Sequence, residues 1–331
     1  MKFKSIIVPR RGGPDVFNVI ENDLRAPLQN EVRIKVLAVP VCLPDVQARY
    51  GTTPFPPRTP FTPGYAIIGT ADAIGNDVTD IEVGDRVAAL IAYGGYSEYI
   101  YLKQKQLVHV PTTIDPADAA TIILNYVLAY QTLHRTAKVK AGDKILIIGA
   151  SGGIGTAYLQ LGKLANLTMY GMASKGKHAI LAKYGATPID YRTQNFVDII
   201  HQLEPNGIKA VFDGVGGDYI KQGVSILRRG GIFVEYGNPL TYSGMFRLLW
   251  QVIASTLRPD GKRINVYGNS SRLSMKPFRE DWARLFKYLE EGKIKPIIHQ
   301  KFPILEAPQA NRLLESGQVV GNIVLLTPEI M

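Results

Sequence analysis

The glycine-rich segment at residues 144–155 constrains the fold more than any other part of the chain. It reads Lys-Ile-Leu-Ile-Ile-Gly-Ala-Ser-Gly-Gly-Ile-Gly, an apolar run followed by residues with small side chains. The run predicts a buried strand over 144–148, and the residues after it predict a helix over 154–165. In that context the pattern is typical of a turn that brings backbone N–H groups and a helix N-terminus close to a pyrophosphate. We therefore predict a dinucleotide-binding loop formed by Ala150, Ser151, Gly152, Gly153, Ile154 and Gly155.

The end of the next predicted strand indicates which dinucleotide is bound. Sites for NAD usually place Asp or Glu about 20 residues past the loop, where it binds the ribose 2′-hydroxyl. Here the strand over 167–173 is followed by Ser174, Lys175, Gly176 and Lys177. One hydroxyl and two ammonium groups suit a 2′-phosphate, so we predict NADPH rather than NADH. The alternative is that the lysines only face solvent.

Hydrophobic patterning divides the chain into two kinds of structure. From about Asp118 expected helices (119–134, 177–184, 196–203, 219–227) alternate with expected strands (188–190, 210–212, 232–234, 264–267). This alternation predicts an α/β domain with a Rossmann doubly wound parallel sheet. Before it, short β-like runs at 6–8, 32–39, 66–74, 86–90 and 99–102 are separated by turn residues and predict a β domain. A helix over 278–290 and β-like segments at 297–302 and 322–326 follow.

Composition excludes several classes of function. A chain of 331 residues has room for about two domains. The net charge of +10 is scattered along the chain, so we expect no nucleic acid partner. A single cysteine rules out an intrachain disulfide and a four-cysteine zinc site. The N-terminus does not read as a signal peptide, and the apolar run 245–257 is too short to span a bilayer. We expect a cytoplasmic protein without a transmembrane segment.

Three groups of motifs resemble the medium-chain dehydrogenase/reductase superfamily, and most closely its zinc-free quinone oxidoreductase branch. They are Gly84-Asp85-Arg86-Val87; Gly142-Asp143-Lys144 with the glycine loop; and Gly185-Ala186 with Ile189-Asp190-Tyr191-Arg192. The resemblance implies a GroES-like catalytic domain over 1–122 and 269–331 and an NADP-binding Rossmann domain over 123–268. It also implies an active-site cleft where the domains meet, and a homodimer formed through the strand 263–267.

The same resemblance assigns further cofactor residues. Lys177 matches a lysine that binds the 2′-phosphate, Tyr191 matches a tyrosine beside the adenosine, and Ser174 assists at the strand end. Gly214, Gly237 and Asn238 match positions that lie against the cofactor. For Gly214 a tight turn without cofactor contact is the alternative.

Zinc-dependent relatives supply a cysteine three residues before an aspartate, a histidine after a glycine, and a later cysteine. The matching positions are Cys42 before Asp45, Tyr65 after Gly64, and Asn125, so the resemblance predicts no catalytic zinc. The chain also departs from the quinone reductase pattern. Cys42 replaces an asparagine near the nicotinamide, and Gln47 and Thr53 replace two tyrosines of the quinone pocket.

The chemistry that this pattern favours is hydride transfer from NADPH to a quinone or an α,β-unsaturated carbonyl compound. We predict catalytic roles for Tyr65, Cys42 and Asn125. Tyr65 either donates a proton or packs in the cleft wall. Cys42 is either a neutral thiol or reactive toward electrophiles, and Asn125 either binds carboxamide or substrate oxygen or is a structural amide. Arg49 is expected to face the cleft.

Two other interpretations compete with this one. Tyr99 and Lys103 have the spacing of the short-chain dehydrogenase pair, but they precede the glycine loop in a strand-like segment, so that class is rejected. A non-catalytic NADPH-binding relative, of the kind found among synaptic-vesicle or lens proteins, stays open. The apolar helix 246–253 would then bind a partner or a membrane surface, whereas we favour a dimer-flanking or pocket-wall position for it.

Overall fold

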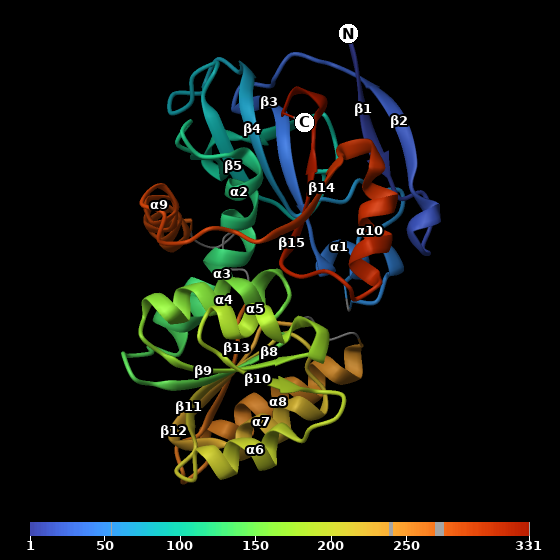
Figure 1. Ribbon diagram of the computed structural model, residues 1–331. Helices are drawn as coiled ribbons and strands as arrows, with labels where there is room; N and C mark the ends of the chain where they lie inside the picture. The colour runs from blue at the N-terminus through green and yellow to red at the C-terminus, as the bar shows by residue number, and fades with distance from the viewer. Residues whose placement is uncertain (54, 238–240, 269–274, 331) are drawn as a thin grey trace. The chain divides into compact units, whose positions relative to one another are not determined.

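The computed structural model describes residues 1–53, 55–237, 241–268 and 275–330. The chain divides into two compact units (Figure 1). Unit 1 is Met1–Val127 with Ser271–Met331, and unit 2 is Leu128–Ser270. The domain borders drawn from the sequence stay a prediction.

Unit 2 is built on a parallel sheet of six strands in the order β10-β9-β8-β11-β12-β13. The strands are β8 (Lys144–Ile148), β9 (Thr168–Ala173), β10 (Thr187–Asp190), β11 (Ile208–Asp213), β12 (Leu227–Glu235) and β13 (Arg263–Val266). The apolar residues of the inner strands β8, β9 and β11 are buried because helices cover both faces of the sheet, whereas the edge strand β13 is largely exposed. The order reverses beside β8, which is the arrangement of a dinucleotide-binding Rossmann sheet. The predicted fold of this half is confirmed.

Helices of unit 2 follow the strands as connections. They are α4 (Gly153–Leu164), α5 (His178–Lys183), α6 (Phe196–Leu203), α7 (Asp218–Ser225) and α8 (Tyr242–Thr256). In Figure 1, α4 and α5 cover one face of the sheet and α6, α7 and α8 cover the other. Leu146, Val211 and Phe233 are buried in the core between the sheet and the second group of helices.

Unit 1 contains a mostly antiparallel sheet in the order β14-β15-β3-β4-β5-β7, with β6 also paired to β3. Its strands are β3 (Glu31–Val41), β4 (Ala66–Ile74), β5 (Arg86–Leu90), β6 (Tyr99–Lys103), β7 (Val108–His109), β14 (Ile298–Pro303) and β15 (Asn322–Leu326). A separate hairpin joins β1 (Lys2–Ile7) to β2 (Asn18–Asp23). Because β15 pairs with β3, residues from both ends of the chain share one core, which includes Ile34, Val87 and Leu325.

The α-helices described in unit 1 include α1 (Leu43–Tyr50), α2 (Pro116–Thr121), α9 (Lys276–Glu290) and α10 (Ala307–Glu315). The sequence did not predict α1, α10 or the strand β2. Each is short, and segments of this length are stabilised by packing against neighbours more than by their own propensity. The helix predicted over 119–134 contains two wide π turns, η3 (Ile122–Tyr126) and η4 (Gln131–Thr136). Within the described part of the chain, every helix is too short or too polar to cross a membrane.

Candidate functional site

The glycine loop lies at the carboxyl end of β8. Gly149 has a φ of +76°, a left-handed conformation that favours glycine, and it turns the chain out of the strand. Gly152 then precedes α4 as its N-cap and offers no side-chain cap. The first N–H groups of an α-helix have no partner inside the helix, and the helix dipole places partial positive charge there. This N-terminus therefore fits a pyrophosphate.

Two glycines of the loop have different structural roles. A Cβ atom on Gly155 would lie 2.3 Å from the Gly149 carbonyl oxygen and 2.5 Å from the Ala150 carbonyl carbon. Only glycine lets α4 approach the strand end this closely. A Cβ atom on Gly152 would lie 3.6 Å from the Gly149 oxygen, which is an ordinary contact. Packing within the protein thus explains Gly155, whereas it leaves Gly152 without a steric reason of its own.

Hydroxyl and cationic groups lie after the ends of β9 and β10. Ser174 precedes a short turn of helix that carries Lys177, and Tyr191 follows β10 directly. Burial, and then the charge of Arg192, lowers the pKa of Lys177. Arg192 donates from Nε to the Tyr191 hydroxyl at 3.4 Å and lies 5.7 Å from the centre of its ring. These groups fit a 2′-phosphate, and Arg192 is a cation that the sequence analysis left out of the site.

Gly214 and Gly237 follow the ends of β11 and β12. A Cβ atom on Gly214 would lie 2.4 Å from Cε2 of the Tyr236 ring, and one on Gly237 would lie 2.5 Å from the Gly214 oxygen. Close packing of the two strand ends therefore requires both glycines, whether or not they touch a cofactor. Asn238 lies outside the described residues.

In unit 1, Cys42 belongs to a buried network centred on Asp45. The Cys42 thiol donates to Asp45 Oδ2 at 2.9 Å, and the Gly64 N–H donates to Asp45 Oδ1 at 2.9 Å. The Tyr96 hydroxyl donates to Asp45 Oδ2 at 3.3 Å. Burial, and then the charge of Asp45, raises the pKa of the Cys42 thiol well above its ordinary value. The thiol therefore stays protonated, which favours the neutral role over the reactive one.

Tyr65 and Asn125 come from two other elements of unit 1. Tyr65 is half-buried, directly before β4, and its carbonyl accepts the Ile91 N–H at 2.8 Å. Asn125 lies in the π turn η3, is buried, and donates from Nδ2 to Asn322 Oδ1 of β15 at 2.5 Å. Asn322 in turn donates to the Ile297 carbonyl at 2.9 Å. This gives Asn125 a structural bond; its catalytic role stays a prediction.

The donor set of unit 1 does not fit a catalytic zinc ion. The thiol of Cys42 is bonded to Asp45, and a phenol and an amide stand at the other two matching positions, Tyr65 and Asn125. Among the residues that the structure describes, no group of three or more His, Cys, Asp or Glu side chains could hold a metal ion.

Arg49 does not have the role expected of it. Its side chain is fully buried, where it donates to the Gly12 carbonyl and pairs with Glu315 of α10. The guanidinium also lies 4.5 Å from the centre of the Tyr50 ring. Arg49 therefore joins the N-terminal segment, α1 and α10, and the prediction that it faces a cleft is wrong.

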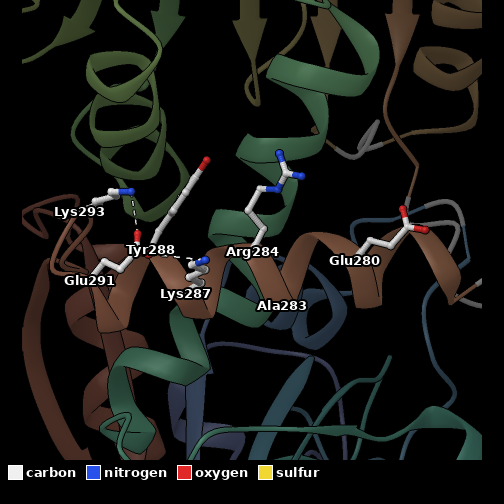
Figure 2. Close-up of a pocket in the computed structure, with 7 residues that line it drawn as sticks. All are labelled: Glu280, Ala283, Arg284, Lys287, Tyr288, Glu291 and Lys293. Atoms are coloured by element: carbon white, nitrogen blue, oxygen red, sulfur yellow. Dashed lines mark ion pairs between the residues drawn. The ribbon is translucent and has the colours of Figure 1, made fainter.

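A hollow of about 540 Å³ lies along α9 and the residues just after it (Figure 2). Its lining includes Arg284, Lys287, Tyr288 and Lys293. Glu291 pairs with Lys293 at 2.7 Å and with Lys287 at 3.8 Å. None of the predicted site residues lines this hollow, so it gives no support to the predicted site.

Comparison with known proteins agrees with this geometry. Residues 28–112 match the alcohol dehydrogenase GroES-like domain, and residues 184–325 match the zinc-binding dehydrogenase family. The chain is 27% identical over 339 residues to the synaptic vesicle membrane protein VAT-1 homolog of Danio rerio, covering 98% of this chain and 70% of that protein. It is 28% identical over 322 residues to human quinone oxidoreductase, covering 95% of each.

A solved structure extends the likeness to the fold. Escherichia coli quinone oxidoreductase complexed with NADPH has a TM-score of 0.87 and 25% identity, over 98% of this chain and 99% of that one. Matches to both domains, a relative aligned over nearly the whole chain and the shared fold point the same way. The chain belongs to the medium-chain dehydrogenase/reductase superfamily, among its quinone oxidoreductase-like members.

Proposed function

We propose that the protein is an NADPH-dependent reductase that acts on a quinone or an α,β-unsaturated carbonyl compound. The observation that carries this proposal is the pairing, in one Rossmann unit, of an uncapped helix N-terminus with a hydroxyl and cationic cluster. Ser174, Lys177 and Arg192 form that cluster, and no acid stands at the end of β9. The first feature suits a pyrophosphate and the second a 2′-phosphate.

In this proposal the residues of unit 2 bind and orient the cofactor. Ser151, Gly152, Gly153 and Ile154 present backbone N–H groups to the pyrophosphate, and Lys177 donates to the 2′-phosphate. Tyr191 packs beside the adenosine, and Gly214 and Gly237 leave room beside the sheet edge. When bound, NADPH supplies a hydride to the electron-poor carbon of the acceptor. The E. coli relative solved with NADPH supports this choice of cofactor.

The residues of unit 1 then serve the acceptor. Conjugation in a quinone or enone carries the developing negative charge to oxygen, so no metal is needed to stabilise it. Tyr65 donates a proton to that oxygen, Cys42 lines the acceptor site as a neutral thiol, and Asn125 hydrogen-bonds the acceptor oxygen or the carboxamide. The bond from Asn125 to Asn322 would fix its side chain for this purpose.

Initial rates test the proposal. NADPH and NADH consumption would be measured over a panel of quinones and enones, with a chelator present. We expect turnover with NADPH that the chelator does not reduce, and much slower turnover with NADH. Tight NADPH binding without turnover on any acceptor would instead support the non-catalytic reading.

The exposed face of α8 supports a second proposal, a homodimer through β13. Among the described strands, β13 pairs only with β12, and Val266 on it is exposed. Large apolar side chains on the neighbouring α8 are also exposed, among them Phe246, Leu249, Trp250 and Ile253. A second copy paired along β13 would cover part of this face, which places α8 beside the dimer edge.

The same exposed face of α8 also favours the non-catalytic candidate. Exposed aromatic and aliphatic side chains on a helix that carries Arg247 and no acid suit a membrane surface. The similarity to proteins named for synaptic vesicle membranes favours it as well. Light scattering in solution and pelleting with anionic liposomes separate the two. A dimer that does not pellet supports the enzyme reading, and a monomer that pellets supports the alternative.

A further inference from the structure

Two buried acids lie next to each other at the carboxyl edge of the Rossmann sheet. Asp213 ends β11 and Glu235 ends β12, and the register of these parallel strands makes the two residues direct partners. Adjacent strands are about 4.8 Å apart, so the carboxyl groups are immediate neighbours. Asp213 has no exposed surface, and only 3% of Glu235 is exposed. The mechanism above uses neither residue.

Each acid holds the loop that follows its own strand. Asp213 accepts the N–H of Val215 on Oδ1 at 2.8 Å and that of Gly216 on Oδ2 at 3.0 Å. Glu235 accepts the N–H of Gly237 on Oε1 at 2.9 Å. These loops contain Gly214 and Gly237, the two glycines predicted to lie against the cofactor. The acids therefore determine the backbone geometry there.

One oxygen of the pair indicates where a proton belongs. Glu235 Oε2 is fully buried and accepts no hydrogen bond from any described group. A carboxylate oxygen in that position would lack water and lie beside the negative charge of Asp213, which is costly. A proton on Oε2 removes the charge and lets Glu235 donate to Asp213. Burial, and then the charge of Asp213, raises the pKa of Glu235 in the same direction.

The surroundings of the pair contain phenols. Tyr236, directly after β12, and Tyr219 on α7 interact with Asp213, and burial raises the pKa of both, so they stay neutral. Tyr158 on α4 packs against Tyr236, and burial raises its pKa as well. Among the described ion pairs, none includes Asp213 or Glu235. A shared proton is thus the means by which the pair avoids two adjacent negative charges.

We propose that Asp213 and Glu235 share one proton and act as positioning residues, which hold the loops after β11 and β12 in place for the cofactor. The part that concerns the cofactor rests on the function proposed above. Loss of the shared proton puts a second negative charge in the buried site, so the strand ends repel each other and the loops loosen. The shared proton should therefore stabilise the protein most below the ordinary glutamate pKa, and the effect should be lost as the pH rises through the raised pKa of Glu235.

The substitution Glu235→Gln tests this directly. The glutamine amide can donate to Asp213 and its oxygen can accept the Gly237 N–H, so it copies the protonated glutamate without titrating. Thermal unfolding without cofactor would be measured from about pH 5 to 9, and NADPH affinity by fluorescence from about pH 7 to 9. Because the pKa of Glu235 is raised to about 8 in the folded protein, the wild-type midpoint should fall up to about pH 8 and level off above it, whereas the Kd should rise above about pH 8. For one proton each equilibrium constant changes by at most about tenfold per pH unit. In Glu235→Gln this part of both pH dependences should be lost.

Glu204→Gln is the matched control in the same unit. Burial raises the pKa of Glu204, but hydrogen bonds from Lys144 and Tyr170 outweigh it and hold the pKa below its ordinary value. This acid is therefore already ionised near neutral pH. Its replacement should lower stability without removing the fall in the unfolding midpoint between about pH 5 and 8.

Several results would overturn the proposal. An equal fall in the unfolding midpoint with pH in the wild type and in Glu235→Gln would exclude the shared proton. A wild-type stability that changes with pH, together with an NADPH affinity that does not, would exclude the positioning role. If Glu235→Gln does not fold, the infrared band of a buried protonated carboxyl in the wild type decides, and its absence at neutral pH excludes the shared proton. A wild type that binds no NADPH refutes the proposed function and the positioning role. The pH dependence of the unfolding midpoint and the infrared band then still test whether Asp213 and Glu235 share a proton.

Discussion

Alanine in place of Gly152 or of Gly155 should produce two different defects, although both glycines belong to one loop. The Cβ introduced by Gly155→Ala would be about 1.1 Å short of ordinary contact with the Gly149 oxygen, because 3.4 Å is ordinary and 2.3 Å is available. The atoms in the way are backbone atoms, so they cannot rotate aside, and α4 must move off the strand end. The Cβ introduced by Gly152→Ala meets nothing closer than 3.6 Å, and the extended backbone at this position suits alanine.

The magnitudes follow from these distances. Forcing an extra carbon into a packed site costs about 1–3 kcal/mol, and the better helix propensity of alanine returns up to about 1 kcal/mol. The net loss for Gly155→Ala is about 1–2 kcal/mol, or roughly 1–3 °C in Tm for a chain of this length. Gly152→Ala should cost about 0.5–1 kcal/mol, because alanine is a poorer N-cap than glycine. Its methyl group would occupy space beside the helix N-terminus, so NADPH affinity should fall about tenfold or more, which is about 1.4 kcal/mol.

Thermal unfolding and NADPH titration on the two variants measure both effects. Gly268→Ala is the control, because a Cβ atom there has no neighbour within 4 Å. Gly152→Ala with unchanged NADPH affinity would refute the assignment of the pyrophosphate to this loop. Gly155→Ala with an unchanged Tm would refute the packing argument.

The remaining predictions concern the 2′-phosphate, the proton donor and a buried ion pair. Lys177→Met should raise the Kd for NADPH by about 10- to 100-fold, the value of one charge-assisted hydrogen bond, and leave the Kd for NADH unchanged; equal losses for both cofactors would contradict the assignment. Tyr65→Phe should lower kcat about 100-fold if the phenol is the proton donor, while NADPH affinity stays the same; unchanged turnover would assign it to packing. Arg49→Met should lower the unfolding free energy in urea by about 2–4 kcal/mol, because it leaves Glu315 and the Gly12 carbonyl without their cation. Glu315→Gln should also be destabilising, because it leaves the fully buried guanidinium of Arg49 without its counter-charge. A loss below about 0.5 kcal/mol for Arg49→Met would contradict the structural role.

Local pattern was sufficient for the Rossmann unit. The strands β8, β9 and β11 are short, mostly apolar runs, β12 contains the run Ile232-Phe233-Val234, and the helices between the strands have their own periodicity, so their order and type could be predicted. The glycine loop was predictable for the same reason, since strand, turn and helix are contiguous in the chain. The helices α1 and α10 were missed because short segments depend on contacts such as Arg49 to Glu315, which join residues far apart in sequence.

The residues of the candidate site also differ in whether they could be predicted from local sequence. Ser174, Lys177 and Tyr191 could be named from motifs at strand ends. Asp45 gave a signal, its spacing from Cys42, but its role as acceptor for Gly64 and Tyr96 required the fold. The sequence signal for Asp213 and Glu235 was a charged residue at the end of a buried strand, but no role was predicted for either residue from it.

The sequence alone determined the parallel sheet, the dinucleotide loop and the absence of an acid at the end of β9, because all three depend on residues that are neighbours in the chain. Only the tertiary structure decided that Gly155 is required by packing, that the Cys42 thiol is neutral, and that the buried Arg49 side chain links the N-terminal segment, α1 and α10. It alone brought Glu235 beside Asp213. Burial and strand register set these properties, and both arise between segments that the sequence keeps apart.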